Sequence, residues 1–375
     1  MLLLALACAP DTSPDKNHSA VYTDSTLTDS RTDDSRESQP KESAVESNTG
    51  GDDSPVESQD SAPVDTAPPS VTDCFAGIGS PLDYAQYNPV MNSKCMGTNY
   101  QNIQGIQRVV FVGDSVTVGT PPTSTDAWYR NLLAEELANR YGLQKPGWDW
   151  ENVNLVDGTT YVQQSGDFMS CAKWGARTDD LILDPHKQLL TCLPEEDRHL
   201  TTLVVMTSGG NDLFSMLQDV QEGVDEATIR ASWDQGMGDL QDAVHYIKDD
   251  PTMFPGGIYF VFANIFDLSD ADGAEDMARC EGAALIGIDV AIRQPLVWEL
   301  VGWWQEQTLA LAIETGSDMI FMGEAFCGHG SNYDSTTGRC YRAADAAVWY
   351  DFTCEHPNDL GHAAIAELVM SVVEE

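Results

Sequence analysis

Basic residues are scarce in this chain, with 19 lysines and arginines against 60 aspartates and glutamates, which gives a formal net charge of −41. A surplus of this size repels phosphate backbones and anionic headgroups, so nucleic acids and anionic lipid surfaces are excluded as partners. After the first few residues the chain also lacks an apolar run long enough to span a membrane. With 42% hydrophobic residues, however, 375 residues can bury a substantial core.

Zinc-type cysteine spacing is also missing, because no two of the nine cysteines form a CxxC pair. The acidic run 267–273 departs from the spacing of an EF-hand calcium loop. We therefore expect no metal and no cofactor. Apart from Cys8 the cysteines are even in number, which predicts four disulfides formed in an oxidising compartment. They are Cys74, Cys95, Cys171, Cys192, Cys280, Cys327, Cys340 and Cys354. Sequential pairing, with a Cys340–Cys354 bridge, is one of many possible arrangements.

The first 73 residues have the composition of an export signal followed by a tether. Residues 1–8 are apolar and end in Cys8, as a bacterial lipoprotein signal ends in its lipidated cysteine. Ala5 stands where leucine is usual and no basic residue precedes the run, which an upstream start codon would explain. Residues 9–73 are rich in Asp, Ser, Thr, Glu and Pro, with Tyr22 their one aromatic residue, so they cannot bury enough apolar area to fold. We predict a disordered acidic tether between a lipid anchor at Cys8 and a domain over residues 74–375.

The most informative stretch is 109–119, where an apolar run of strand character ends in a serine flanked by glycines. Residues 109–112 are all apolar, as in a buried parallel strand, and Gly113 and Gly119 permit sharp turns on either side of Ser115. Open α/β sheets place their chemistry at the carboxyl ends of the strands. This pattern predicts that Ser115 is a nucleophile, although a strand followed by Gly-Asp-Ser is also typical of an ordinary helix N-cap.

Two later segments supply the other groups that such a nucleophile needs. Residues 203–212 repeat the pattern of a buried strand that ends in glycines, now followed by Asn211, whose amide can donate to an oxyanion. His356 opens a segment that leads into a predicted final helix, and it can act as a general base. His362 and His329 are better explained as structural residues of that helix and of a loop between cysteines.

Taken together, the motifs resemble the SGNH (GDSL-type) hydrolases. Four blocks occur in the order of that family: residues 113–115 with Gly119, residues 171–178, residues 209–212, and residues 356–358 with 361–362. The resemblance implies that Ser115 is the nucleophile and His356 the base. It also implies an oxyanion hole made of the Ser115 and Gly175 backbone N–H groups and the Asn211 side chain. A preorganised donor of this kind is worth about 3–4 kcal/mol.

The chain departs from the family at one position. The family carries an aspartate three residues before the base histidine, and here that position is Thr353. The Thr353 backbone carbonyl could orient the His356 ring, or Asp351 could supply the carboxylate, and we favour the carbonyl slightly. Glu355 adjoins the histidine and ranks last. A loss of activity is less expected, because every other block is intact.

Alternating strand and helix patterns predict one α/β domain, a three-layer α/β/α sandwich with a parallel, flavodoxin-like sheet. Strands are expected near 107–113, 151–156, 202–207, 257–264 and 318–323, and helices near 126–142, 226–249, 282–315 and 359–373. A strand order of 2-1-3-4-5, as in the family resembled, would bring Ser115, Gly175 and Asn211 together. Trp298, Trp303 and Trp304 have the spacing of core residues rather than of a lid.

These observations predict an exported serine ester hydrolase of the carboxylesterase or lipase type, acting through an acyl-enzyme. The alternatives are a carbohydrate O-acetyl esterase, a GDSL-type phospholipase or acyltransferase, and a catalytically silent surface-binding module. The expected partner is an ester substrate, either an acyl ester, a lipid or an acetylated glycan, and the protein is expected to be a monomer. Contact with a membrane is expected only through the anchor of a cell-envelope lipoprotein, unless the protein is secreted.

Overall fold

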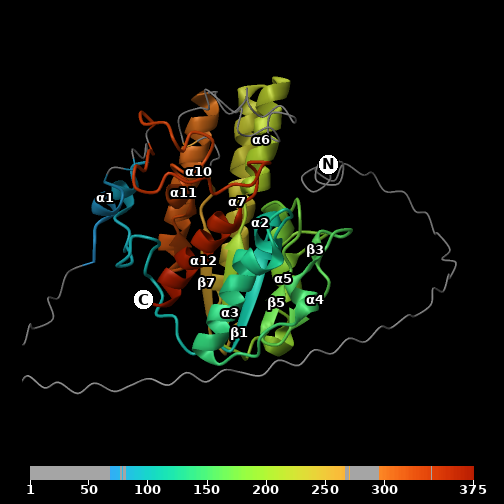
Figure 1. Ribbon diagram of the computed structural model, residues 1–375. Helices are drawn as coiled ribbons and strands as arrows, with labels where there is room; N and C mark the ends of the chain where they lie inside the picture. The colour runs from blue at the N-terminus through green and yellow to red at the C-terminus, as the bar shows by residue number, and fades with distance from the viewer. Residues whose placement is uncertain (1–67, 77, 79–81, 267–269, 271–294, 339) are drawn as a thin grey trace, which may run out of the picture. The chain divides into compact units, whose positions relative to one another are not determined.

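The computed structural model describes residues 68–76, 78, 82–266, 270, 295–338 and 340–375, which belong to one compact unit. The predicted anchor and most of the predicted tether lie outside these residues, as do Cys280 and all of the acidic run except Asp270. No helix in the described part is long and apolar enough to cross a membrane. Figure 1 shows a central sheet covered by helices.

The central sheet has six strands in the order β4-β5-β1-β6-β7-β8. Five of them are parallel: β1 (Arg108–Gly113), β5 (Phe168–Ser170), β6 (Thr202–Thr207), β7 (Ile258–Ala263) and β8 (Asp318–Ile320). The edge strand β4 (Gln164–Ser165) is antiparallel to β5. Every residue of β1 and β6 is buried, as expected of parallel strands with helices on both faces. The predicted α/β class is therefore confirmed, with one antiparallel strand added at the edge.

The prediction of a sheet strand at 151–156 was wrong. That region contains α4 (Trp148–Glu151) and β2 (Val153–Asn154), which pairs with β3 (Thr159–Thr160) in a separate two-stranded sheet. Its apolar residues Leu155 and Val156 are 55% and 92% exposed at the tip of this hairpin, so they contribute nothing to the core. The second strand of the sheet is instead β5, and with that change the order 2-1-3-4-5 is correct.

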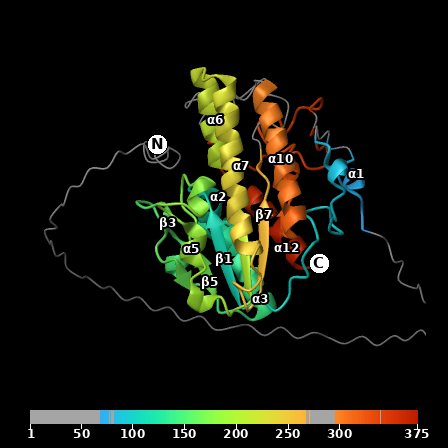
Figure 2. The same cartoon turned by 180° about the vertical axis from the view of Figure 1, so that it is seen from behind.

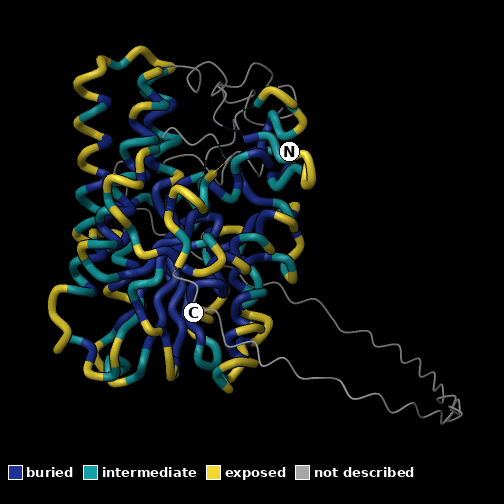
Figure 3. The backbone as a smooth tube through the Cα atoms, turned by 90° about the vertical axis from the view of Figure 1, so that its left-hand side faces the viewer, coloured by how far each residue is buried: buried dark blue, intermediate teal, exposed yellow. Residues whose placement is uncertain are grey.

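Helices cover both faces of the sheet (Figures 1 and 2). The two faces bury different sides of the same strands, because successive side chains point in opposite directions. On one face, Val109 and Phe111 of β1 pack with α3 (Tyr129–Tyr141) and α12 (Asp359–Val373). On the other, Val110 and Val112 belong to the core that contains α7 (Glu226–Lys248) and α10 (Pro295–Thr315). In Figure 3 the strands form the buried centre of the molecule.

The predicted helices near 126–142, 226–249 and 359–373 correspond to α3, α7 and α12. Of the predicted helix at 282–315, the described residues form α10, and residues 282–294 lie outside them. Sequence reasoning missed α6 (Gly210–Glu222), which begins inside the Gly-Gly-Asn-Asp block. The other short helices among the described residues are α1 (Val71–Cys74), α2 (Ser115–Val118), α5 (Gln188–Cys192) and α11 (Met322–Phe326), with 3₁₀ turns at Tyr84–Tyr87, Thr125–Ala127, Asp179–Leu181 and Glu195–Asp197.

Three disulfides join described cysteines: Cys74–Cys95, Cys171–Cys192 and Cys327–Cys340. Their Cα–Cα distances of 5.2, 6.0 and 5.3 Å lie in the usual range for disulfides. The first two follow the sequential pairing. The expected Cys340–Cys354 bridge is wrong, because Cys340 pairs with Cys327, and Cys354 is itself disulfide-bonded.

Candidate active site

Ser115 lies where the central strand β1 ends and the short helix α2 begins. Gly113, with φ of +124°, closes the strand so near to β6 that a Cβ atom there would collide with the Thr207 carbonyl oxygen. Asp114 is the N-cap of α2, and its carboxylate accepts a hydrogen bond of 2.9 Å from the Val116 N–H. These two residues fix Ser115 at the carboxyl edge of the sheet, as the sequence predicted.

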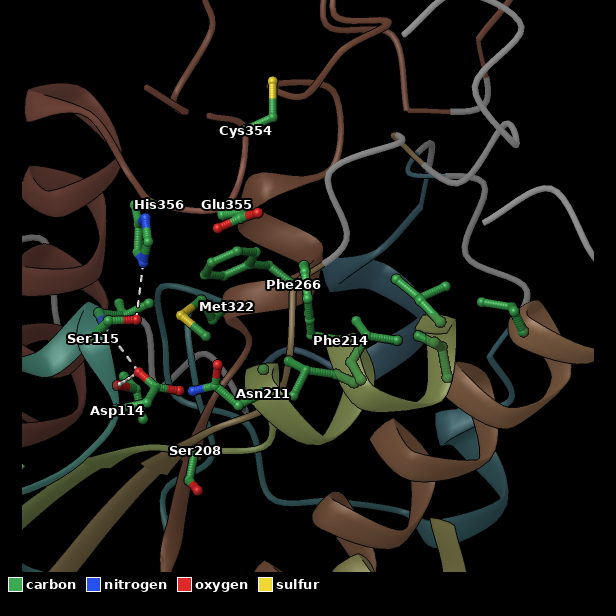
Figure 4. A pocket seen from close by; sticks show the side chains of 18 of the residues that line it. Asp114, Ser115, Ser208, Asn211, Phe214, Phe266, Met322, Cys354, Glu355 and His356 are labelled. Atoms are coloured by element: carbon green, nitrogen blue, oxygen red, sulfur yellow. Dashed lines mark hydrogen bonds between the residues drawn. The ribbon is translucent and has the colours of Figure 1, made fainter. Parts of the chain in front are cut away.

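His356 reaches this serine from a loop near the C-terminus. Its Nε2 lies 2.9 Å from Ser115 Oγ, and the two residues are 4% and 5% exposed (Figure 4). The loop is folded back on itself, because the Asp351 N–H donates to the His356 carbonyl at 2.9 Å. Burial lowers the pKa of His356 to about 4. The imidazole is therefore neutral at pH 7 and able to accept a proton.

Neither proposed orienting group is hydrogen-bonded to the imidazole ring. The Asp351 carboxylate accepts bonds from the Thr353 N–H, at 2.8 Å, and from the Thr353 hydroxyl. This is an Asx-turn, in which a side chain bonds the backbone two residues later. Burial raises the pKa of Asp351. Glu355, which the sequence made the least favoured orienting group, lines the cavity beside His356. In the described structure Asp351 thus shapes the loop that carries His356.

The predicted oxyanion donors differ in their relation to the cavity. Asn211, in the first turn of α6, lines the same cavity as Ser115, and Figure 4 shows it beside Asp114. Its Nδ2 donates to the Ala176 carbonyl at 2.8 Å, which fixes the amide and leaves a second hydrogen for an oxyanion. Gly175, with φ of +75°, precedes that carbonyl in the chain but is not among the residues that line the cavity.

Two buried carboxylates support this edge of the sheet, and sequence reasoning gave them no role. Asp212 accepts hydrogen bonds from the Thr178 N–H and hydroxyl, at 3.1 and 3.0 Å, and pairs with Arg177 at 3.5 Å. It therefore joins the first turn of α6 to the 171–178 block. Burial, with Asp212 nearby, raises the pKa of Asp114 to about 7. Asp114 and Asp212 could have been recognised in the sequence from their places inside the Gly-Asp-Ser and Gly-Gly-Asn-Asp motifs.

An apolar cavity opens at Ser115 and extends between α6 and α10. Most of its lining is hydrophobic: Val116, Leu213, Phe214, Leu217, Ile265, Phe266, Val297, Trp298, Val301 and Met322. Trp304 is 1% exposed in the core, as predicted, whereas Trp298 lines the cavity. Trp174 does not line it, and its indole N–H donates to the Gly119 carbonyl at 3.0 Å.

The other two histidines singled out in the sequence have structural contacts. His362 Nδ1 accepts a hydrogen bond of 3.2 Å from the Tyr129 N–H, and burial lowers the pKa of His362 to about 3. His329 is stacked on Trp349, with ring centroids 3.6 Å apart, and its Nδ1 bonds the Ala347 carbonyl at 2.8 Å. Within the described ranges no cluster of His, Cys, Asp or Glu side chains could hold a metal ion.

The fold and the site define an α/β protein with a buried serine–histidine pair at the carboxyl edge of its sheet. No protein-family model matches the sequence, and no curated protein matches it. Among solved structures it is similar to a GDSL-like lipase from Parabacteroides merdae, with 14% identity, a TM-score of 0.41 and coverage of 73% of this chain and 98% of that one. A lipase from a goat rumen metagenome has 12% identity and a TM-score of 0.44, over 71% of this chain and 97% of that one. The phospholipase A1 of Streptomyces albidoflavus has 16% identity and a TM-score of 0.38, over 71% and 99%.

Proposed function

We propose that this protein is a serine ester hydrolase of the SGNH type, which acts through an acyl-enzyme on Ser115 with His356 as general base. The observation that carries the proposal is the 2.9 Å contact between His356 Nε2 and Ser115 Oγ, buried at the mouth of an apolar cavity. A serine hydroxyl becomes a useful nucleophile when a base lies within hydrogen-bond reach, at about 2.6–3.2 Å.

In the first half of the reaction, Ser115 Oγ bonds to the ester carbonyl carbon as its proton passes to His356 Nε2. The negative oxygen of the tetrahedral intermediate accepts hydrogen bonds from the Ser115 and Gly175 N–H groups and from Asn211. The anchored amide of Asn211 supports this role. The ester C–O bond then breaks, and the alcohol leaves with the proton from His356. In the second half, His356 takes a proton from water as the water attacks the acyl-enzyme carbonyl carbon. The bond from that carbon to Ser115 Oγ then breaks, the acid leaves, and His356 returns the proton to Ser115 Oγ.

Because Thr353 replaces the aspartate that the family carries, the proposal is a Ser-His dyad in which the loop that carries His356, rather than the Asp351 carboxylate, orients the base. The bonds between Asp351 and Thr353 support this proposal, because they engage the Asp351 carboxylate in shaping the loop. A catalytically silent binding module is the second candidate, and the position of Thr353 is the observation that favours it.

The apolar lining of the cavity supports an acyl ester as substrate. An acetyl group would leave most of that lining unused, so a carboxylesterase or lipase ranks ahead of a carbohydrate O-acetyl esterase, with a phospholipase or acyltransferase as a further alternative. Export is part of the proposal, supported by the disulfides, which form in oxidising compartments. Lipidation of Cys8 and a monomeric state complete it.

A phosphonate ester tests the assignment directly, because it reacts covalently with an activated serine. We expect it to label Ser115 in the wild-type domain and to label nothing in Ser115→Ala or His356→Ala. A parallel screen with p-nitrophenyl esters from acetyl to palmitoyl, and with acetylated xylan, separates the substrate classes. Labelling of another serine would overturn the choice of nucleophile, and absence of both labelling and hydrolysis would favour the binding module.

A further inference from the structure

Two helices provide the apolar part of the cavity, and the lining residues have the same sequence spacing on both helices. Leu213, Phe214 and Leu217 face it from α6. Val297, Trp298 and Val301 face it from α10. Positions i, i+1 and i+4 share one side of a helix, so each helix presents a continuous apolar stripe. Figure 4 shows Phe214, Phe266 and Met322 around the same space as Ser115 and His356. We call the space between the two stripes the α6–α10 slot.

The size of the slot limits what can enter it. The cavity has a volume of about 90 Å³. One water-sized group occupies about 10–15 Å³, so the cavity admits several such groups. A methylene group is similar in size to a water molecule. The volume therefore fits one acyl chain of medium length.

A second cavity, of about 430 Å³, lies on the other side of α10. Its lining includes charged residues, among them Arg230, Asp234, Glu299 and Glu306, and it includes neither Ser115 nor His356. Trp298 lines both cavities. The Trp298 side chain therefore borders both the slot and the second cavity.

We infer that the α6–α10 slot holds the acyl chain of the substrate and that Trp298 closes its far end, so that the enzyme prefers medium-chain esters. This inference rests on the proposed function and adds its specificity-determining residue. Each methylene buried in the slot is expected to raise kcat/KM about fourfold, from the free energy of burying one methylene. A chain that reaches the Trp298 ring gains nothing further and must bend out of the slot.

The test compares kcat/KM for p-nitrophenyl butyrate, octanoate, laurate and palmitate in the full chain. For the wild type we expect a maximum at octanoate and a fall of at least about tenfold at palmitate. Trp298→Ala joins the two cavities and should move the maximum to laurate or beyond, with butyrate changed by less than about threefold. Trp303→Ala is the matched control, because Trp303 lines only the second cavity, and its profile should follow the wild type.

A second variant keeps the inference testable if Trp298→Ala fails to fold. Leu213 is only partly buried, so Leu213→Trp can narrow the slot from the opposite helix, and it should move the maximum to butyrate. Unchanged chain-length profiles in folded Trp298→Ala and Leu213→Trp would overturn the inference while the hydrolase assignment stands. Failure of the wild type to hydrolyse any ester would instead defeat the proposed function.

Discussion

The two halves of the cavity are built in different ways. The polar half is centred on Ser115 at the end of β1, where Gly113 and the register between β1 and β6 fix the backbone, and a loop near the C-terminus adds His356. The apolar half comes from side chains on α6 and α10, whose positions depend on packing. Substitutions in the polar half should therefore affect whether the reaction occurs. Substitutions in the apolar half should affect which ester the enzyme prefers. Each prediction below tests this division.

The largest effect is expected from Ser115→Ala, which removes the attacking oxygen. We expect kcat/KM for p-nitrophenyl octanoate to fall by about 10⁴ or more, as in other serine hydrolases that lose the nucleophile. Ser208→Ala is the matched control, since Ser208 lines the same cavity and its hydroxyl has no hydrogen-bond partner among the described residues. Its activity should stay within about threefold of wild type. Equal losses in the two variants would mean that the polar half acts through its shape and not through one nucleophile.

The polar half was largely readable from the sequence, and the apolar half was not. Strands β1 and β6 each hold four consecutive apolar residues and are closed by a nearby glycine, Gly113 or Gly209, so Ser115 and Asn211 could be placed at the sheet edge in advance. β5 has three residues, too few to show a pattern, whereas the longer segment 151–156 carries Val153, Leu155 and Val156 and resembles a strand in the sequence. The slot was missed because α6, which carries one of its two apolar stripes, was not predicted, and because Trp298 was expected in the core.

The His356 loop could be predicted only in part. The histidine itself stood out beside a predicted helix, but its position depends on bonds between Asp351 and Thr353 and on which cysteines pair. Pairing is set by three-dimensional distance, and sequence spacing does not determine it. The wrong Cys340–Cys354 bridge has this cause.

The next prediction concerns pH. Burial lowers the pKa of His356 to about 4, so the ring stays in the neutral form that accepts a proton. The ordinary pKa of histidine is about 6.5. We expect kcat/KM to keep its value well below that pH and to fall only as pH approaches about 4. Loss of activity with a midpoint near 6.5, in protein still folded by circular dichroism, would contradict a buried base.

The circular dichroism control is needed because the same burial affects stability. His356 and His362 have pKa values lowered in the folded state, to about 4 and about 3. Below about pH 6.5 the unfolded chain therefore binds more protons than the folded one. The contribution of these histidines to stability is present above that pH and is lost as pH falls, so rates must be compared only where the protein is folded.

A smaller effect is expected from Asp351→Asn. The asparagine side-chain oxygen can still accept the Thr353 N–H, so the loop should keep its shape and kcat should stay within about fivefold of wild type. Removal of a carboxylate that orients the base lowers kcat by about 10⁴ in a serine protease. A loss of that size, with the fold intact, would make Asp351 the third member of a triad. Thr353→Asp provides the complementary test, because it restores the residue that the family carries at this position.

The smallest effect is expected in stability rather than activity, from Asp114→Asn. Burial raises the pKa of Asp114 to about 7, so the folded state holds this proton more tightly than the unfolded state does. Its contribution to stability is complete below the unfolded pKa of about 3.9 and is lost as pH rises through about 7. Asparagine keeps the acceptor for the Val116 N–H but cannot ionise, so the variant should lose less Tm between pH 5 and pH 8 than the wild type does. Asp225→Asn is the control, because Asp225 caps α7 and hydrogen bonds from Thr228 lower its pKa. This variant should not reduce the loss of Tm between pH 5 and pH 8. If Asp114→Asn and Asp225→Asn reduced the pH dependence of Tm equally, burial of Asp114 beside the nucleophile would not be the cause of that dependence. The polar half would then resemble any other helix N-terminus of this protein.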